Sequence, residues 1–477
     1  MSESDAAEQV TNNVPFRIKE IDTSKEAWPP LSDRLRRCDE VENLTPLLET
    51  VEAPLVFAID SPWGGGKTTF IELWQKYLKE KTNSKTCLYL NAWENDFAED
   101  PLLPLLSCFD DWLSKEKDDS IAKALNNLKK LSPAIIKGGV SVISKLATLG
   151  TLDLSKEYEK VIADAVGGSV ETLVDQFQSQ KNSLKYFKEN LQTVVSILPE
   201  GQQNLIIFID ELDRCRPTFA IELLERIKHL FDLERVVFVV AVNREQLGKS
   251  IKCVYGNDFD GHAYLDRFFD LEYQLSDPDR HEYIKAASIK SGLHKHLSTR
   301  KHIINSDYLQ ILLVWLCSHY SLTLRDINRI VSRLTLIIKS TVQDTHIHLE
   351  ALTLLLFLRN KDEDHYNQFI NGTCSANDIV KHLLLDEPSR LEKLKEPQIM
   401  TLVIGRLLAL EENEAIFKQS IAHWEAEHKT YEGDTQMQRY ISSILKHTKN
   451  SYDQRIPENI INMMAKKVEL LQKIEVN

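Results

Sequence analysis

The chain has 477 residues, of which 43% are hydrophobic and 27% are charged. This length is enough for about three domain-sized units with a large buried core. The net charge of −13 argues against nucleic acid as a partner of the whole protein, because phosphate backbones attract basic surfaces. The seven cysteines form no C-x-x-C pair, which indicates reduced thiols in a cytoplasmic protein and argues against a disulfide framework or a zinc site.

The N-terminal residues 1–15 are acidic and polar, so we expect them to be disordered and to carry no secretory signal. The best candidate for a membrane helix is 139–154. It contains Lys145 and Asp153 and falls short of the roughly 20 apolar residues that a spanning helix needs. We therefore expect no integral membrane segment.

A short helix is predicted over 33–42, and Thr45-Pro46 is typical of the cap and first position of a further helical turn. The apolar run 55–60 then predicts a buried strand, followed by a glycine-rich turn and an amphipathic helix that reaches about Lys81.

This strand–turn–helix has the layout of a Walker A phosphate-binding loop, in which backbone N–H groups and a helix N-terminus surround phosphates. Lys67 would reach the β- and γ-phosphates of ATP, and the hydroxyl of Thr68 would bind Mg²⁺. The alternative is an ordinary strand–turn–helix corner with a surface lysine. The predicted nucleotide-binding residues are Ser61, Pro62, Trp63, Gly64, Gly65, Gly66, Lys67, Thr68 and Thr69.

Two of these residues need comment. Ser61 stands where the usual pattern has a glycine, and we interpret it as tolerated because serine accepts a turn. Trp63 could shape the loop or pack beside the nucleotide, and we favour plain packing over both of these roles.

A second strand is predicted over 86–91, and the pattern from about 101 to 200 is helical. The run 204–213 then predicts a central parallel strand that ends in carboxylates, typical of a Walker B segment. Asp210 is placed to hold Mg²⁺, and Glu211 to polarise the attacking water. The alternative is a core strand that ends in a solvated acidic turn.

A helix over 216–232, a strand over 236–242 ending at Asn243, and a strand near 269–275 complete an alternating pattern. Alternation of this kind predicts an α/β fold with a three-layer parallel sheet. Residues beyond 280 are predicted to be almost entirely helical.

Five ordered blocks resemble the KAP family of P-loop NTPases, and the resemblance covers about 35–335. The resemblance implies a core related to AAA+ and STAND ATPases, with a helical module inserted between the Walker motifs at about 101–200. It also suggests bacterial anti-phage defence as the setting. The blocks are 62–64, 91–93, 209–215, 264–269 and 324–329.

Further candidate site residues are a departure from the family pattern at Asn243 and several arginines of this chain. Asn243 stands where an acid is frequent and can orient water or the γ-phosphate by hydrogen bonding. By resemblance to AAA+ relatives, Arg267 would act in trans across a subunit interface and Arg325 as a sensor from a helical domain. Arg214 and Arg329 are further candidates, and for each arginine the alternative is a surface ion pair.

The predicted domains are the disordered segment 1–15, a P-loop core 16–280, a helical lid 281–340 and a C-terminal helical domain 341–477. Two H-x-H pairs, His294 with His296 and His346 with His348, have no evident third ligand, so we interpret them as solvated loop histidines.

The main hypothesis is an ATPase with ATP and Mg²⁺ as cofactors, in which hydrolysis switches conformation or assembly, with possible homo-oligomers and with protein partners on the helical regions. ATP is favoured over GTP because no Asn-Lys-x-Asp motif follows the strand 236–242. The alternative is a nucleotide-binding scaffold or signalling adaptor with little turnover. A nucleic-acid motor is disfavoured, because no basic stripe with aromatic residues is evident.

Overall fold

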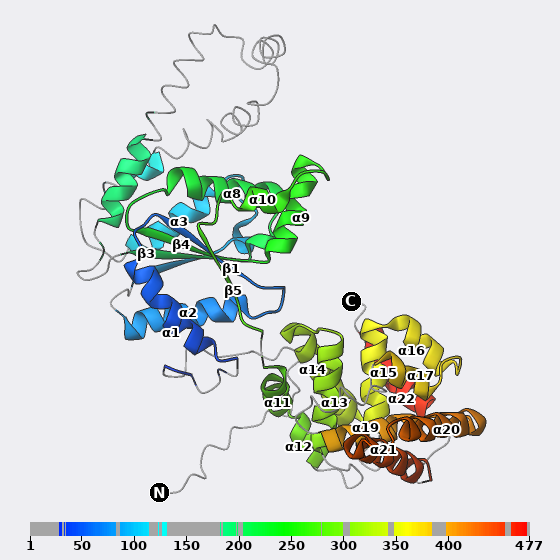
Figure 1. The fold of residues 1–477 in the computed structure, drawn as a ribbon. Helices are drawn as coiled ribbons and strands as arrows, with labels where there is room; N and C mark the ends of the chain where they lie inside the picture. The colour runs from blue at the N-terminus through cyan, green and yellow to red at the C-terminus, as the bar shows by residue number, and fades with distance from the viewer. Residues whose placement is uncertain are drawn as a thin grey trace, which may run out of the picture. The chain divides into compact units, whose positions relative to one another are not determined.

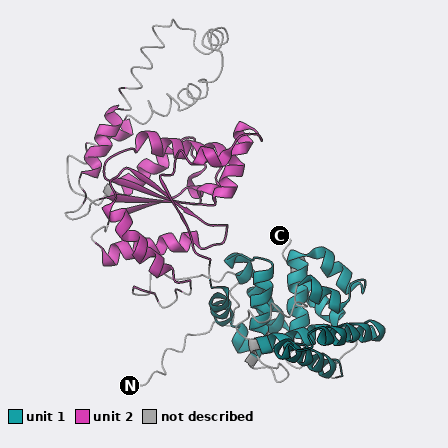
Figure 2. Ribbon diagram, in the orientation of Figure 1, with its two compact units in different colours: residues 1–20, 278–477 teal, residues 21–277 magenta. Residues whose placement is uncertain are grey.

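The computed structural model describes most of the chain in two compact units (Figure 2). We call residues 21–277 the sheet unit and residues 278–477 the helical unit. The predictions for 1–15 and 139–154, and most of those for the insertion, lie outside the described residues. The described residues are 28–30, 33, 35–82, 86–113, 123, 126–130, 182, 185–196, 198, 204–277, 279–298, 306–341, 348–383, 397–453 and 459–474.

The sheet unit is built on five parallel strands in the order β2-β3-β4-β1-β5. Four of them are runs of apolar residues, and β3 and β4 are buried along their whole length, as expected of a sheet covered on both faces. The predicted α/β fold is confirmed. The strands are β1 Leu55–Asp60, β2 Cys87–Asn91, β3 Leu205–Asp210, β4 Val236–Val242 and β5 Leu271–Gln274.

Helices cover both faces of this sheet and make it a three-layer structure (Figure 1). Side chains alternate along β1, so Phe57 and Ile59 join the core on one face while Val56 and Ala58 join the core on the other. The first face is covered by α1 Arg37–Thr50 and α2 Lys67–Lys81. The second is covered by α3 Leu102–Leu113, α8 Pro217–Leu230, α9 Arg244–Tyr255 and α10 Gly261–Leu265.

The prediction of two helical segments around Pro46 was wrong, because α1 is one helix with Pro46 inside it. A proline in a helix interior costs about 3 kcal/mol. Burial of Val41 and Leu48 on the core side of α1 offsets this cost, and the Trp74 indole of α2 donates a 2.9 Å hydrogen bond to the Thr45 hydroxyl. Tertiary packing therefore outweighs the local signal.

Among its described residues, the helical unit contains helices joined by turns and no strand. α13 contacts both α15 and α19, and α14 contacts α15 and α22, so helices from both sides of residue 340 pack together. The division into 281–340 and 341–477 stays a prediction. The helices used below are α11 Arg280–Lys290, α12 Leu293–Ser298, α13 Ser306–His319, α14 Leu324–Ser340, α15 Leu349–Lys361, α16 Glu363–Ile370, α17 Ala376–His382, α19 Pro397–Leu408 and α22 Ile460–Ile474.

Candidate nucleotide site

The predicted site lies at the carboxyl edge of the sheet. β4 lies between β1 and β3, so the loops after these three strands start side by side. Hydrogen bonds tie this edge together: the Ser61 N–H donates to the Val242 carbonyl at 3.2 Å, and the Ala92 N–H donates to the Asp210 carbonyl at 2.9 Å. Carboxyl ends of parallel strands are where open α/β sheets bind ligands.

The glycines of the loop have separate physical reasons. Gly64 and Gly66 have φ angles of 78° and 89°, a region that favours glycine. At Gly65, an added Cβ would lie only 2.0 Å from the Ser61 hydroxyl oxygen. Ser61 therefore fills the space that Gly65 leaves free, so the two residues are coupled.

α2 begins directly after the loop, with Gly66 as its N-cap and no side chain capping it. The first N–H groups of a helix that lacks a capping side chain can bind an anion, and the helix dipole favours negative charge there. Arg37, which is 1% exposed, supports the loop from α1 by donating a 3.2 Å hydrogen bond to the Gly65 carbonyl. Arg37 lies in the helix predicted over 33–42 but was not among the predicted site residues.

Lys67 is buried and bonded to its own loop. Its Nζ donates to the Ser61 carbonyl at 2.6 Å and lies 4.0 Å from Asp213 Oδ2. Burial lowers the pKa of Lys67, and the charges of Asp213 and Asp210 partly offset that effect. A cationic amine held at the loop in this way is positioned for phosphate oxygens.

Asp213 is a site residue that sequence reasoning missed. Its Oδ2 accepts a hydrogen bond from the Trp63 indole, in addition to facing Lys67. Trp63 is 43% exposed, and its indole links the loop to the segment after β3, which fits a role in shaping the loop. Whether Trp63 also packs beside a nucleotide stays a prediction. The position of Asp213 within the block 209–215 was the available signal.

Asp210 has the features of a cation ligand. It is 1% exposed, and burial raises its pKa, although hydrogen bonds from the Thr68 hydroxyl and the Glu211 N–H oppose that rise. Its Oδ1 accepts the Glu211 N–H at 2.8 Å, while its Oδ2 is buried and has no hydrogen-bond partner among the described residues. A hydroxyl beside an unsatisfied carboxylate oxygen is a hard-oxygen donor set that fits Mg²⁺.

Glu211 is held in a defined position. Its backbone has φ 60°, which is uncommon outside glycine and costs of order 1–3 kcal/mol. The Asn91 side-chain amide donates to Oε2 at 3.3 Å, and the Arg214 guanidinium pairs with Oε1. The Arg214 guanidinium carbon also lies 5.7 Å from the ring centre of Trp93, so Arg214 is engaged at Glu211, and its role as a phosphate sensor stays a prediction.

Comparison with known proteins places this site in a family. The model of the KAP family P-loop domain matches residues 38–341. The chain belongs to the KAP family. In Escherichia coli K12, the phage T7 exclusion protein is 23% identical over 271 residues, which cover 55% of this chain and 35% of that protein. An uncharacterized protein of Methanocaldococcus jannaschii is 29% identical over 172 residues, covering 32% of this chain and 87% of that protein.

This member of the KAP family spans about a third of the phage T7 exclusion protein. The family match carries the P-loop fold and, in general terms, nucleotide binding. Within the described ranges, no helix of this KAP protein is both long and apolar enough to cross a bilayer.

Asn243 lies at the end of β4 and is 8% exposed. Its side-chain oxygen accepts the Gln246 N–H at 3.1 Å and so caps α9. Asn243 therefore has a structural role in this KAP protein beside the role predicted at the γ-phosphate.

Arg267 precedes β5, whose first residue, Leu271, is opposite Phe57 in β1. β1 and β5 are parallel, so the start of β5 lies toward the amino end of β1, while Asp266 beside Arg267 pairs with Arg244, the residue after Asn243. It is exposed, with its guanidinium carbon 5.9 Å from the ring centre of Tyr264. The guanidinium of Arg267 is thus engaged at Tyr264, and its role at the γ-phosphate stays a prediction.

The remaining candidates lie in the helical unit. Arg325 and Arg329 are exposed on α14, which begins after the Thr323 cap. His294 and His296 lie on α12, so their assignment to a loop was wrong. His348 caps α15 by accepting the Ala351 N–H, and His346 lies outside the described residues.

Proposed function

We propose that the carboxyl edge of the sheet binds ATP with Mg²⁺ and hydrolyses it, and that turnover switches conformation or assembly. The observation that carries this proposal is the buried Oδ2 of Asp210, which has no hydrogen-bond partner among the described residues. Asp210 is the last residue of β3, and it lies beside the hydroxyl of Thr68 in the first turn of α2. Mg²⁺ at this pair would neutralise charge on the phosphates.

Different residues of the chain would bind the phosphates, polarise the attacking water and orient it. The N–H groups of 64–68 and the Lys67 ammonium would bind the phosphates, which requires Lys67 to exchange its bond with the Ser61 carbonyl for phosphate oxygens. Glu211 would polarise the attacking water with the oxygen that Asn91 holds, while Arg214 restrains the other oxygen. Asn243 would orient the water or the γ-phosphate.

We further propose that Arg267 acts in trans in a homo-oligomer. Its exposed guanidinium, which lies over the ring of Tyr264 and not at the P-loop, supports this role, because an exposed arginine is available to the γ-phosphate of a second copy. Partner proteins would bind the helical regions. Anti-phage defence is proposed as the setting, on the similarity to a protein named for phage T7 exclusion.

A second candidate function is a nucleotide-binding scaffold with little turnover. The observation that favours it is that both Glu211 oxygens and the Lys67 amine are already engaged within the chain. In that case bound ATP would stabilise one conformation without hydrolysis.

Phosphate release under single-turnover conditions separates the two candidates. We expect Mg²⁺-dependent release in the wild type, and retained ATP binding with turnover reduced roughly 100-fold in Glu211→Gln. Glu234→Gln, an exposed substitution just before β4, is the matched control and should match the wild type. If the wild type and Glu211→Gln both bind ATP and both release no phosphate, the scaffold is correct.

Light scattering with the Glu211→Gln form then tests assembly. We expect a larger particle with ATP than without it. A mixture of Arg267→Ala and Lys67→Ala chains should turn over ATP faster than either variant alone, because the Lys67→Ala chain supplies Arg267 to the intact site of its neighbour. A mixture no faster than its two parents would contradict a role in trans. A purely monomeric Glu211→Gln form at all ATP concentrations removes the trans proposal.

A further inference from the structure

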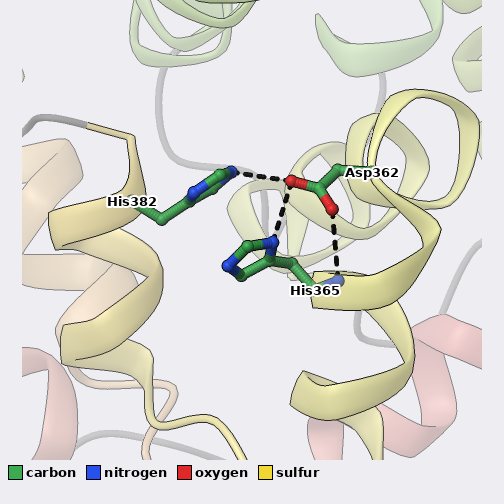
Figure 3. A group of neighbouring side chains, drawn as sticks. All are labelled: Asp362, His365 and His382. Atoms are coloured by element: carbon green, nitrogen blue, oxygen red, sulfur yellow. Dashed lines mark hydrogen bonds and ion pairs between the residues drawn. The ribbon is translucent and has the colours of Figure 1, made fainter.

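Three side chains of the helical unit converge where α15, α16 and α17 meet (Figure 3). Asp362 joins α15 to α16 and caps α16, His365 lies in the first turn of α16, and His382 is the last residue of α17. Asp362 Oδ2 is 2.9 Å from His365 Nδ1 and 2.7 Å from His382 Nε2. The three candidate ligand atoms all lie within 4.8 Å of one another.

The two ring nitrogens are buried, yet neither has a hydrogen-bond partner of acceptable geometry in the part of the chain that the structure describes. Both point at the same carboxylate oxygen, and their rings stack with centres 3.8 Å apart and planes at 20° (Figure 3). A single cation between the nitrogens and the carboxylate satisfies all three groups.

Neighbouring groups add to the polar character of this place. Among the described residues, the Tyr320 hydroxyl is also buried without a hydrogen-bond partner, and burial together with the nearby charge of Asp362 raises the pKa of Tyr320. The ring of His319 is 5.9 Å from that of His382. The side chains of Asp362, His365 and His382 are 18%, 33% and 28% exposed, so an ion from solvent can reach them.

We propose that Asp362, His365 and His382 bind one divalent transition-metal ion of the Zn²⁺ class. Two imidazole nitrogens and one carboxylate oxygen are ligands that Zn²⁺ prefers, with water as the fourth ligand. Zn²⁺ bonds of about 2.0–2.1 Å place tetrahedral ligand atoms roughly 3.3 Å apart, so the carboxylate and the rings need to separate by only about half an ångström. Mg²⁺ and Ca²⁺ prefer all-oxygen sites and fit this set poorly.

The ion ties the α15–α16 junction to the end of α17. This linkage is a structural clamp within the helical unit and is independent of the nucleotide proposal. The ligands are separated by 3 and 17 positions (365 − 362 and 382 − 365) and include no cysteine, which explains why a search for cysteine pairs and H-x-H pairs did not find them.

The test is Co²⁺ and Zn²⁺ titration of the chelator-treated full-length chain, with excess Mg²⁺ present to compete at Asp210 and Thr68. We expect one Co²⁺ per chain with the visible absorption of a four-coordinate ion, displaced by one Zn²⁺. His365→Gln and His382→Gln should each weaken Zn²⁺ binding about 100-fold. His294→Gln, an exposed histidine on α12, should bind as the wild type does.

The wild-type spectrum decides the proposal even if a variant does not fold, and far-UV circular dichroism with ATP binding reports folding. The proposal is overturned if the wild type binds no Co²⁺ or Zn²⁺ tightly. It is also overturned if the folded His365→Gln and His382→Gln variants bind Zn²⁺ as well as the wild type, because Asp362 and the histidines then form only a hydrogen-bonded cluster.

Discussion

The sheet unit and the helical unit gather polar side chains in different ways. In the sheet unit, Ser61, Asp210 and Asn243 meet because parallel strands end at one edge. In the helical unit, Asp362 and His382 meet because three helices happen to pack there. A site at strand ends can therefore be predicted from local motifs and their order in the sequence. A site between helices depends on tertiary packing, which local motifs do not reveal.

The largest expected effect concerns the amine at the strand-end site. Lys67→Ala removes the cation that the loop holds for phosphate, so we expect ATP turnover to fall at least about 100-fold, roughly 2.7 kcal/mol in activation free energy. Phosphate release measures it. Lys79→Ala, an exposed lysine on the same helix, should leave the rate unchanged. Equal rates for Lys67→Ala and the wild type would mean that the P-loop is not the reacting site.

The second prediction uses ligands to separate the two units. Free Zn²⁺ at roughly 100 times its dissociation constant should stabilise the helical unit by about 2.7 kcal/mol, because only the folded cluster binds it. Thermal unfolding should show the shift in the transition of the helical unit and not in the transition that ATP shifts. His382→Gln should lose the Zn²⁺ shift and keep the ATP shift. If Zn²⁺ raises the temperature of only the ATP-sensitive transition, the ion binds the sheet unit, and the prediction is wrong.

The same difference explains what the sequence could predict. Apolar runs that stop at turn residues or acidic residues predict the strand ends and the loop. The same pattern predicts the site residues Thr68, Asp210 and Glu211. The roles of Asp213 and Arg37 did not follow, because each depends on a contact across the fold: Asp213 with Trp63, and Arg37 with the Gly65 carbonyl. Pro46 led to the wrong prediction that one helix ends and another begins there, because burial of α1 outweighs the local preference of proline for a helix start. The Asp362 cluster has no local signature at all.

The third prediction tests how tightly the P-loop is packed. Gly65→Ala places a Cβ against the Ser61 hydroxyl, so we expect ATP binding to weaken about tenfold, or about 1.4 kcal/mol. Ser61→Gly combined with Gly65→Ala should recover most of that loss, because it removes the nearest atom. Isothermal titration of the two single variants and the double variant measures the coupling. Additive losses would show that Ser61 and Gly65 do not share this space.

The smallest expected effect is a gain in stability. Asp210→Asn removes a buried charge whose Oδ2 has no hydrogen-bond partner among the described residues, while the Asn oxygen can still accept the Glu211 N–H. We expect the free energy of unfolding at neutral pH to rise by about 1 kcal/mol. This is the usual gain from a substitution that removes a destabilising group from a functional site. Urea unfolding of the ATP-sensitive transition measures it, with exposed Asp232→Asn as the control.

The pH dependence of this gain identifies its cause. Burial raises the pKa of Asp210 in the folded chain above its ordinary value of 3.8. Below 3.8 the carboxyl is neutral in both the folded and unfolded states, so the wild type and Asp210→Asn should be equally stable there. As the pH rises through the raised pKa, ionisation costs the folded wild type stability and the gain in Asp210→Asn grows. A gain that persists unchanged toward pH 3.8 would instead indicate better packing of the amide, and a loss at neutral pH would contradict the idea that the sheet edge keeps a destabilising carboxylate for its ligand.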